Sequence, residues 1–334
     1  MRKSIGLLTA SLFAALAALP AAAQTAKPSI VFGLPGIPPV FVSTQAYVAQ
    51  QEKFFEKYGV TVTLRPFDSG ASAARALASG DVDISLSPSP LIVNMLSNNP
   101  SVDIVAIYGH EKPDWLIGSL DPTITKCEQI KGLPVGVDSL GGARSIALAQ
   151  MLRQCGLKAE DTQQVPLSTN VHTAMITGQL KVGVLHIDDV PIIERESKKK
   201  IITVVDVNDV QKVNHYMAVS TTQKRLADNR DAYVRFLAAM IEAEHFMRDP
   251  KNADKVAQAA SPTGRSIDEA KWAVDTYVKM NFWPKDNAGL SKDNIESIIA
   301  AQKRVGGIRA DATPVAYDRF ANTSVFADAL KMVK

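Results

Sequence analysis

A glycine-containing turn between a short apolar strand and a helix is the first part of the sequence that could bind something. It lies in the stretch VGVDSLGGARSIALAQML, residues 135–152, which fits neither the dinucleotide fingerprint nor the phosphate-loop motif. Gly141 and Gly142 open the predicted helix, whose first turn carries unpaired N–H groups and a positive partial charge. We therefore expect a cradle for an anionic or polar head group, reinforced by Arg144.

Two other interpretations of this turn remain open from the sequence. Asp138 either caps the helix through its side chain or binds a donor on the ligand. The two glycines alternatively form no more than a tight turn. Ser139 and Ala143 belong to the same loop, and we include both among the candidate ligand contacts.

Two further loops follow predicted strands and offer hydroxyl groups or an accessible backbone. In GIPP, Gly36, Ile37 and Pro38 come after the strand SIVFGL, and in SPSP, Ser87 and Ser89 come after DVDISL. Both serine hydroxyls could donate to a carboxylate, although Ser89 could equally cap the next helix. We expect both loops to face the ligand.

Aromatic and histidine side chains form a third group of candidates. Tyr108 and His110 end one predicted strand, His186 ends another, and His215 precedes a third. All four could line a ligand site, and the alternative for Tyr108, His110 and His215 is packing at a hinge.

His186 and Asp188 would share one face of a strand, so this His-x-Asp pair could be part of a metal site. No His or Cys cluster completes a ligand set, and neither a Gly-x-Ser-x-Gly elbow nor a His-Glu-x-x-His motif occurs. We therefore expect no metal, no cofactor and no catalysis.

The elements that must position these residues alternate between strand and helix, which predicts mostly parallel sheets covered by helices. The alternation occurs twice, and irregular stretches near Glu111 and His215 separate the halves. We predict a two-lobed α/β protein with two connecting strands and a helical C-terminal part packed on the first lobe. Lobe I comprises residues 24–112 and 218–334, and lobe II comprises residues 113–217. Open α/β sheets bind ligands at the carboxyl ends of their strands, so facing lobes would enclose one cleft.

The chain contains two cysteines, Cys127 and Cys155. Cys127 precedes the strand at Val135, and Cys155 ends the helix that follows this strand. A helix that runs back along its strand would bring both sulfurs to the same end of the unit. We expect a disulfide in an oxidising compartment, with two separate buried thiols as the alternative.

The N-terminus has the pattern of a cleaved signal peptide. In MRKSIGLLTASLFAALAALPAAAQ, Arg2 and Lys3 precede an apolar run that ends in small residues at 21–23. Cleavage before Gln24 would release the rest of the chain into an exported compartment and lower its formal net charge from +3 to +1. A nearly neutral protein gives no electrostatic reason to expect nucleic-acid binding, which would require a basic face.

Several segments, in this order along the chain, resemble the periplasmic solute-binding proteins of ABC importers, in particular the nitrate/sulfonate/taurine and NMT1/THI5-like group. They are AYVAQQEKFFEKYGVTVTL, ALASGDVDISLSPSP, IKGLPVGV with LRQCGLKAED, MITGQLKVGVLHIDDV and NRDAYVRFLAAMIEAEHFMRDP. The resemblance implies the type II periplasmic-binding-protein fold. It also implies a monomeric periplasmic subunit that captures a small molecule in its cleft and delivers it to a membrane permease.

The resemblance leaves the ligand open between a small organic anion, such as a sulfonate or aromatic carboxylate, and a thiamine-pyrimidine-like compound. Apolar Ile37, Val40 and Phe41, together with Tyr108 and Arg144, favour the organic anion. A soluble sensor for a membrane receptor would share the same fold and cleft. A THI5-like or metal-dependent enzyme is a further alternative, but the cysteine-rich motif of the yeast-type synthases is absent with two cysteines.

Overall fold

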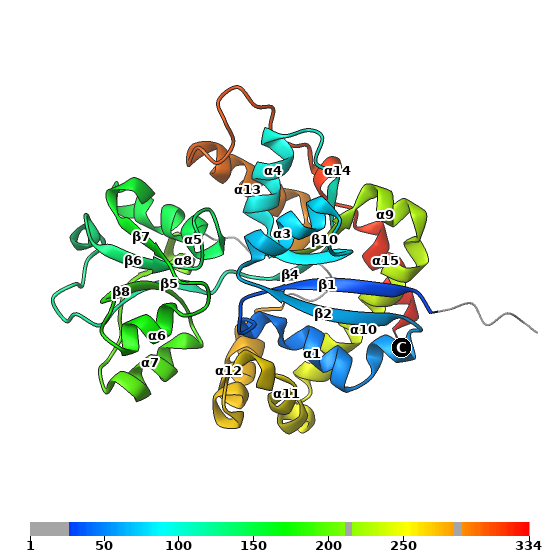
Figure 1. Ribbon diagram of the computed structural model, residues 1–334, viewed down its shortest axis with the longest axis horizontal. Coiled ribbons are helices and arrows are strands. Elements are labelled where there is room, and N and C mark those ends of the chain that lie inside the picture. Colours follow the sequence, from blue (N-terminus) through cyan, green and yellow to red (C-terminus); the bar gives the residue numbers. More distant parts are fainter. Residues whose placement is uncertain (1–26, 211–215, 284–288, 334) are drawn as a thin grey trace, which may run out of the picture.

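The computed structural model describes residues 27–210, 216–283 and 289–333, which form two lobes, each built on a five-stranded sheet (Figure 1). The first sheet has the spatial order β2 (Thr61–Phe67), β1 (Ser29–Pro35), β3 (Ile84–Pro88), β10 (Met217–Thr222) and β4 (Ile104–Glu111). The second has the order β7 (Gln163–Pro166), β6 (Pro134–Val137), β8 (Val182–His186), β5 (Trp115–Ser119) and β9 (Ile202–Asp206). We call the part around the first sheet lobe I and the part around the second lobe II.

Both sheets are mixed, because the strands next to the crossings run against their neighbours. β10 is antiparallel to β3 and β4, and β5 is antiparallel to β8 and β9. The remaining pairs, β1 with β2 and β3 and β6 with β7 and β8, are parallel, as the alternation of strands and helices predicted. The chain leaves lobe I after β4, enters lobe II as β5, and returns as β10.

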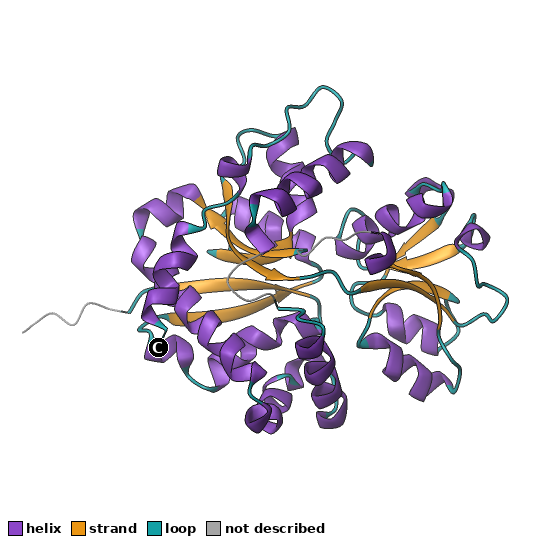
Figure 2. Cartoon of the chain, turned by 180° about the vertical axis from the view of Figure 1, so that it is seen from behind, coloured by secondary structure: helices purple, strands orange, loops and turns teal. Residues whose placement is uncertain are grey.

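Helices cover the sheets of both lobes (Figure 2). Lobe II has α5 (Ala143–Leu152), α6 (Val171–Ile176), α7 (Asp189–Ser197) and α8 (Val207–Val210). Lobe I has α1 (Thr44–Gln51), α2 (Phe54–Lys57), α3 (Gly70–Ser79), α4 (Ser89–Asn98) and α9 (Gln223–Asp228). Its C-terminal helices are α10 (Arg230–Arg248), α11 (Ala253–Ala259), α12 (Ile267–Lys279), α13 (Lys292–Arg304), α14 (Tyr317–Phe320) and α15 (Ser324–Met332). Short 3-10 turns connect several of them, including η2 (Cys127–Ile130), η3 (Arg153–Cys155) and η6 (Ser261–Thr263).

The helical C-terminal part packs on lobe I, as predicted. The long helix α10 lies against α1 and α15, and its Phe236 is fully buried. The ring of Phe236 meets the edge of Phe32 of β1, with a centroid distance of 5.2 Å. Burial of two such rings contributes roughly 1.5–3 kcal/mol each to folding.

The predicted disulfide is confirmed. Cys127 in η2 and Cys155 in η3 are bonded, and their Cα atoms lie 5.9 Å apart. The bond joins the segment before β6 to the end of the helix after it, where the topology argument placed both sulfurs.

Two predictions concern residues outside the described ranges. The signal peptide, residues 1–23, precedes the first described residue, and His215 lies in the gap before residue 216. Among the helices that are described, none combines the length and the apolar character needed to cross a membrane.

Candidate functional site

A small cavity lies between the two lobes. Its volume is about 30 Å³, so the lobes are closed on each other. Lobe I lines it with Pro35, Val40, Val42, Asp68, Ser69, Gly70, Glu111 and Met217. Lobe II lines it with Trp115, Asp138, Ala143, Arg144, Thr169 and His186.

The cavity gathers the carboxyl ends of strands from both sheets. Pro35 ends β1, Glu111 ends β4 and His186 ends β8, while Asp68 follows β2 and Asp138 follows β6. This is the edge at which open α/β sheets bind ligands, and the place at which the sequence predicted the cleft.

Direct hydrogen bonds hold the two lobes together beside the cavity. Ser139 of lobe II donates its hydroxyl to Oγ of Ser69 in lobe I at 3.2 Å. Ser168 of lobe II donates to the carbonyl oxygen of Asp68 at 2.7 Å. Both bonds exist only when the lobes are closed, so they contribute to the difference in free energy between the closed and open forms.

The glycine turn of lobe II is occupied by a carboxylate of the chain itself. Asp138 accepts the N–H of Ala143 at 2.9 Å and the N–H of Arg144 at 3.1 Å. Gly141 has φ +70°, and a Cβ on Gly142 would lie 2.6 and 2.7 Å from the two carboxylate oxygens of Asp138. The expectation of free donors for an anion at this helix start is therefore wrong for these two N–H groups, because Asp138 caps them.

The guanidinium of Arg144 is also paired within lobe II. It donates to the carbonyl oxygen of Val184 at 2.7 Å and to Asp189 at 3.3 Å, and it lies 5.6 Å from the ring centroid of Trp115. Although burial raises the pKa of Asp189, the guanidinium groups of Arg144 and Arg265 hold it below its usual range. Arg144 thus borders the cavity with its charge already neutralised.

Three carboxyl groups belong to the lining of the cavity: Asp68 is exposed, Asp138 is half-buried and Glu111 is buried. Glu111 is 3% exposed, and one of its oxygens lies 2.5 Å from Nδ1 of His110. Burial and the neighbouring Asp114 raise the pKa of Glu111 well above its usual value. Burial also raises the pKa of Asp138, although the N–H groups that it caps act in the opposite direction.

Trp115 contributes an unsatisfied donor to the same cavity. Its side chain is 4% exposed, and its ring lies 3.7 Å from that of His186 between centroids. Its indole N–H is buried and has no hydrogen-bond acceptor among the described residues. Buried polar groups without a partner are uncommon in folded proteins, so this N–H is a candidate ligand contact.

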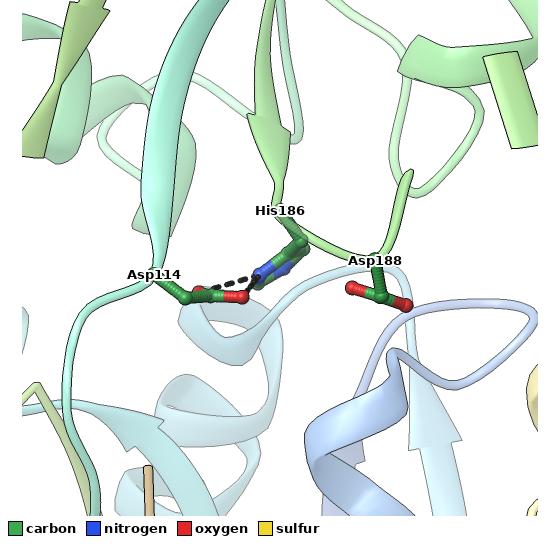
Figure 3. Close-up of side chains that lie close together, drawn as sticks. All are labelled: Asp114, His186 and Asp188. Atoms are coloured by element: carbon green, nitrogen blue, oxygen red, sulfur yellow. Dashed lines mark hydrogen bonds and ion pairs between the residues drawn. The ribbon is translucent and has the colours of Figure 1, made fainter. Parts of the chain in front are cut away.

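Asp114, His186 and Asp188 form a cluster at the edge of the cavity (Figure 3). Their potential ligand atoms lie within 4.8 Å of one another, and Nδ1 of His186 is 2.9 and 3.1 Å from the oxygens of Asp114. Tyr277 places its hydroxyl 2.6 Å from Asp114 and 2.8 Å from Asp188, and Arg265 donates twice to Asp188 at 2.8 and 3.0 Å. The carboxylates are thus bound by protein donors, which makes the cluster an ion-pair network between the lobes.

The loop GIPP borders the closed interface. Gly36 has φ +94°, and a Cβ there would lie 2.5 Å from the side chain of Thr169. The carbonyl oxygen of Ile37 accepts from the hydroxyl of Thr169 at 2.9 Å, while the Ile37 side chain is 51% exposed. Pro38 is exposed. The loop contacts lobe II at the rim, outside the lining of the cavity.

Several other predicted residues lie within lobe I. Ser87 donates its hydroxyl to the carbonyl oxygen of Gly70 at 2.9 Å, and Ser89 donates its backbone N–H to Tyr216 at 2.8 Å. Tyr108 stacks on Phe326 at 5.6 Å between ring centroids, and burial raises its pKa. His110 is not part of the lining, but it contacts Glu111, which is.

Sequence reasoning missed several residues of the lining. Asp68 and Ser69 directly follow the strand TVTLRPF, so the rule applied to GIPP and SPSP would have found them. Glu111 lies at the first crossing between the lobes, where the sequence has no pattern that indicates a ligand contact. Trp115 begins an antiparallel strand, and Thr169 lies in a loop without a distinguishing pattern, so neither gave a signal.

A second, wider groove also spans the lobes, with a volume of about 680 Å³. It is lined by Ala149, Arg153 and residues 156–160 and 304–306, and it includes the exposed side chains of Arg153, Lys158 and Arg304. No strand end reaches it, and no buried polar atom without a partner lies among its described lining residues. The enclosed cavity is therefore the stronger candidate for a specific site.

Comparisons with known proteins agree with this architecture. A curated relative, the taurine-binding periplasmic protein of Escherichia coli (strain K12), is 28% identical over 264 residues, which cover 74% of this chain and 77% of the relative. The periplasmic nitrate-binding protein NrtA from Synechocystis PCC 6803 has the same fold, with a TM-score of 0.73 at 11% identity over 92% of this chain and 89% of that chain. The desulfurization enzyme DSZB also shares it, with a TM-score of 0.62 at 13% identity over 91% and 99%.

The fold is thus found both in binding proteins and in a desulfurization enzyme, and a family model is more specific. The model described as "NMT1/THI5 like" matches residues 40–253, which is more than half of the chain and spans both lobes. This protein belongs to the NMT1/THI5-like family.

Proposed function

We propose that this protein is the extracytoplasmic solute-binding subunit of an ABC importer, which captures a small organic compound between its lobes and delivers it to a membrane permease. The observation that carries the proposal is the cavity between the lobes, which strand ends of both lobes line with polar side chains. Binding of a solute there requires no cofactor and no catalytic step.

The comparisons support the same function. The similar curated protein is a taurine-binding periplasmic protein, and the fold is shared with a periplasmic nitrate-binding protein. The signal-peptide pattern at the N-terminus supports a periplasmic location, and the disulfide fits an oxidising compartment.

Capture follows from the two-lobed geometry. A ligand that contacts both lobes binds the closed form more tightly than the open form, so it shifts the population toward closure. The hydrogen bonds of Ser139 and Ser168 between the lobes form when the lobes close around the ligand. The closed form then presents one continuous surface, made of both lobes, to the permease.

A thermal-shift panel tests the proposal. A compound that binds only the folded protein stabilises it, so the melting temperature rises with the concentration of the compound. At a free concentration of 100 times the dissociation constant, the gain in unfolding free energy is about 2.7 kcal/mol. The panel contains small sulfonates, nitrate, aromatic carboxylates and aminopyrimidines, the classes among which the sequence left the choice open. A saturable shift with one class supports solute capture. If no compound raises the melting temperature, the proposed function is wrong.

A further inference from the structure

The charges around the interlobe cavity are unevenly matched. Asp68, Glu111 and Asp138 line it with carboxyl groups. The guanidinium of Arg144, in the same lining, is bonded to Val184 and Asp189. A ligand that carries only negative charge would lie next to three carboxyl groups, with no unpaired cation in the described lining to offset its charge. Burial of such a charge without a partner is costly.

Trp115 offers a buried donor to a ligand. The indole N–H of Trp115 is buried and lacks an acceptor among the described residues, although Trp115 lines the cavity. Trp115, Glu111 and Asp138 belong to the lining of the same cavity. Its volume of about 30 Å³ has room for water only, so a ligand that contacts all three residues would hold the lobes slightly further apart.

We propose that the ligand carries a nitrogen cation or a polarised N–H group, held by Glu111 and Asp138, together with an acceptor that receives the indole N–H of Trp115. This rests on the proposed function, and it narrows the ligand from small organic compounds in general to amine-bearing or amidine-like ones. A simple organic anion without nitrogen, which the sequence favoured, matches only the Trp115 side of the site.

The two carboxyl groups suit such a group for different reasons. Glu111 is fixed by His110 through one oxygen, and its environment already disfavours the negative charge, so a cation from the ligand would restore the balance. Asp138 caps the first turn of α5 with both oxygens, and each oxygen has a second lone pair that can still accept a hydrogen bond. A ligand N–H between them would join lobe I to lobe II.

Matched pairs of compounds test this directly by calorimetric titration. Each pair differs only in its amino group: taurine and ethanesulfonate, 4-aminobenzoate and benzoate, 4-aminopyrimidine and 4-methylpyrimidine. We expect the amino member of the pair that binds to be at least tenfold tighter than its partner. Equal affinities, or tighter binding of the member without the amino group, would overturn this inference and leave solute capture intact. Absence of binding by every compound would overturn the proposed function itself, and this inference with it.

Variants of Glu111 and Trp115 test which residue causes the preference for the amino member of each pair. Glu111→Gln keeps the size of the side chain and an acceptor for His110, and we expect the advantage of the amino member to fall at least tenfold while its partner is little affected. Glu296→Gln, in an exposed part of α13, is the matched control and leaves the preference unchanged. Trp115→Phe should weaken both members of a pair by a similar factor, because it removes only the donor. An undiminished preference in Glu111→Gln would overturn the assignment.

Discussion

At the scale of single residues, the cavity carries groups that are unfavourable in an empty protein. Glu111 is a buried carboxyl with a raised pKa, and Trp115 has a buried N–H without an acceptor in the described part of the chain. Features of this kind cluster at functional sites, where a ligand supplies the missing partner. The raised pKa of Glu111 also makes the stability of the protein depend on pH in a direction that can be measured.

Glu111→Gln should stabilise the ligand-free protein at neutral pH and not at acid pH. Because the pKa of Glu111 in the folded protein is raised above the unfolded value of about 4.3, ionisation of the carboxyl destabilises the fold as the pH rises above that value. Below it the group is protonated in both states and has no effect. The expected gain is about 1.4 kcal/mol for each pH unit by which the pKa is raised.

Urea unfolding at pH 4 and pH 7.5 checks this prediction. The difference in unfolding free energy between the variant and the wild-type protein should be larger at pH 7.5. A difference that is the same at both pH values would show that Glu111 is not destabilised by ionisation, whatever its role with the ligand.

Sequence alone identified a loop of lobe II that lines the cavity and left the role of its residues open. The pattern DSLGGAR placed Asp138, Ala143 and Arg144 at the end of a strand, and all three line the cavity. It could not show whether Asp138 caps the helix, because this depends on the distance between its carboxylate and two N–H groups. Nor could it show that Arg144 is paired with Asp189, which lies on another helix.

At the scale of elements, the order of strands and helices determined much of what could be predicted. Strand-to-helix turns and the helical C-terminal part follow from local periodicity, and the structure has both. The antiparallel direction of β5 and β10 could not be read from local patterns, because it results from the path of the chain between lobes. Trp115 and Glu111, which flank that path, were missed for the same reason.

The disulfide is an element-scale feature with a measurable effect on stability. Cys127 and Cys155 are 28 residues apart, and closing a loop of this length in the unfolded chain contributes about 3.5 kcal/mol in the chain-entropy model. The double variant Cys127→Ser/Cys155→Ser should therefore lose about 3 kcal/mol of unfolding free energy, measured in urea.

Ligand affinity is the control for this variant, since the bond lies outside the cavity lining. We expect the affinity of any compound found in the panel to change by less than about threefold at a temperature where the variant is folded. A loss of stability below ~1 kcal/mol would contradict the expected contribution of the loop.

At the scale of the whole molecule, an ion-pair network fastens the C-terminal part of lobe I to lobe II. Arg265, between η6 and α12, bonds Asp188 and also Asp189 at 2.8 Å, and Tyr277 of α12 reaches Asp114 and Asp188. These residues are buried or nearly so. Removal of one partner from a buried pair typically costs 3–5 kcal/mol, because the other charge is left without compensation.

Arg265→Ala should therefore favour the open form. We expect the radius of gyration in small-angle X-ray scattering to rise and the ligand affinity to fall at least tenfold. Arg195→Ala is the matched control: Arg195 of α7 pairs with Glu269 of α12 between the same lobes, but its side chain is 51% exposed, and such pairs are worth about 0–1 kcal/mol. Equal effects of both variants would contradict a special role for the buried network.

Tryptophan fluorescence tests the location of the ligand most directly. The chain has three tryptophans, and Trp115 lines the cavity, whereas Trp272 is 43% exposed on α12. A compound that raises the melting temperature should produce a saturable change in emission in the wild-type protein and in Trp272→Phe, and the change should be lost or strongly reduced in Trp115→Phe. If Trp115→Phe binds the compound and still gives the full change, the ligand lies elsewhere and the cavity between the lobes is not the binding site.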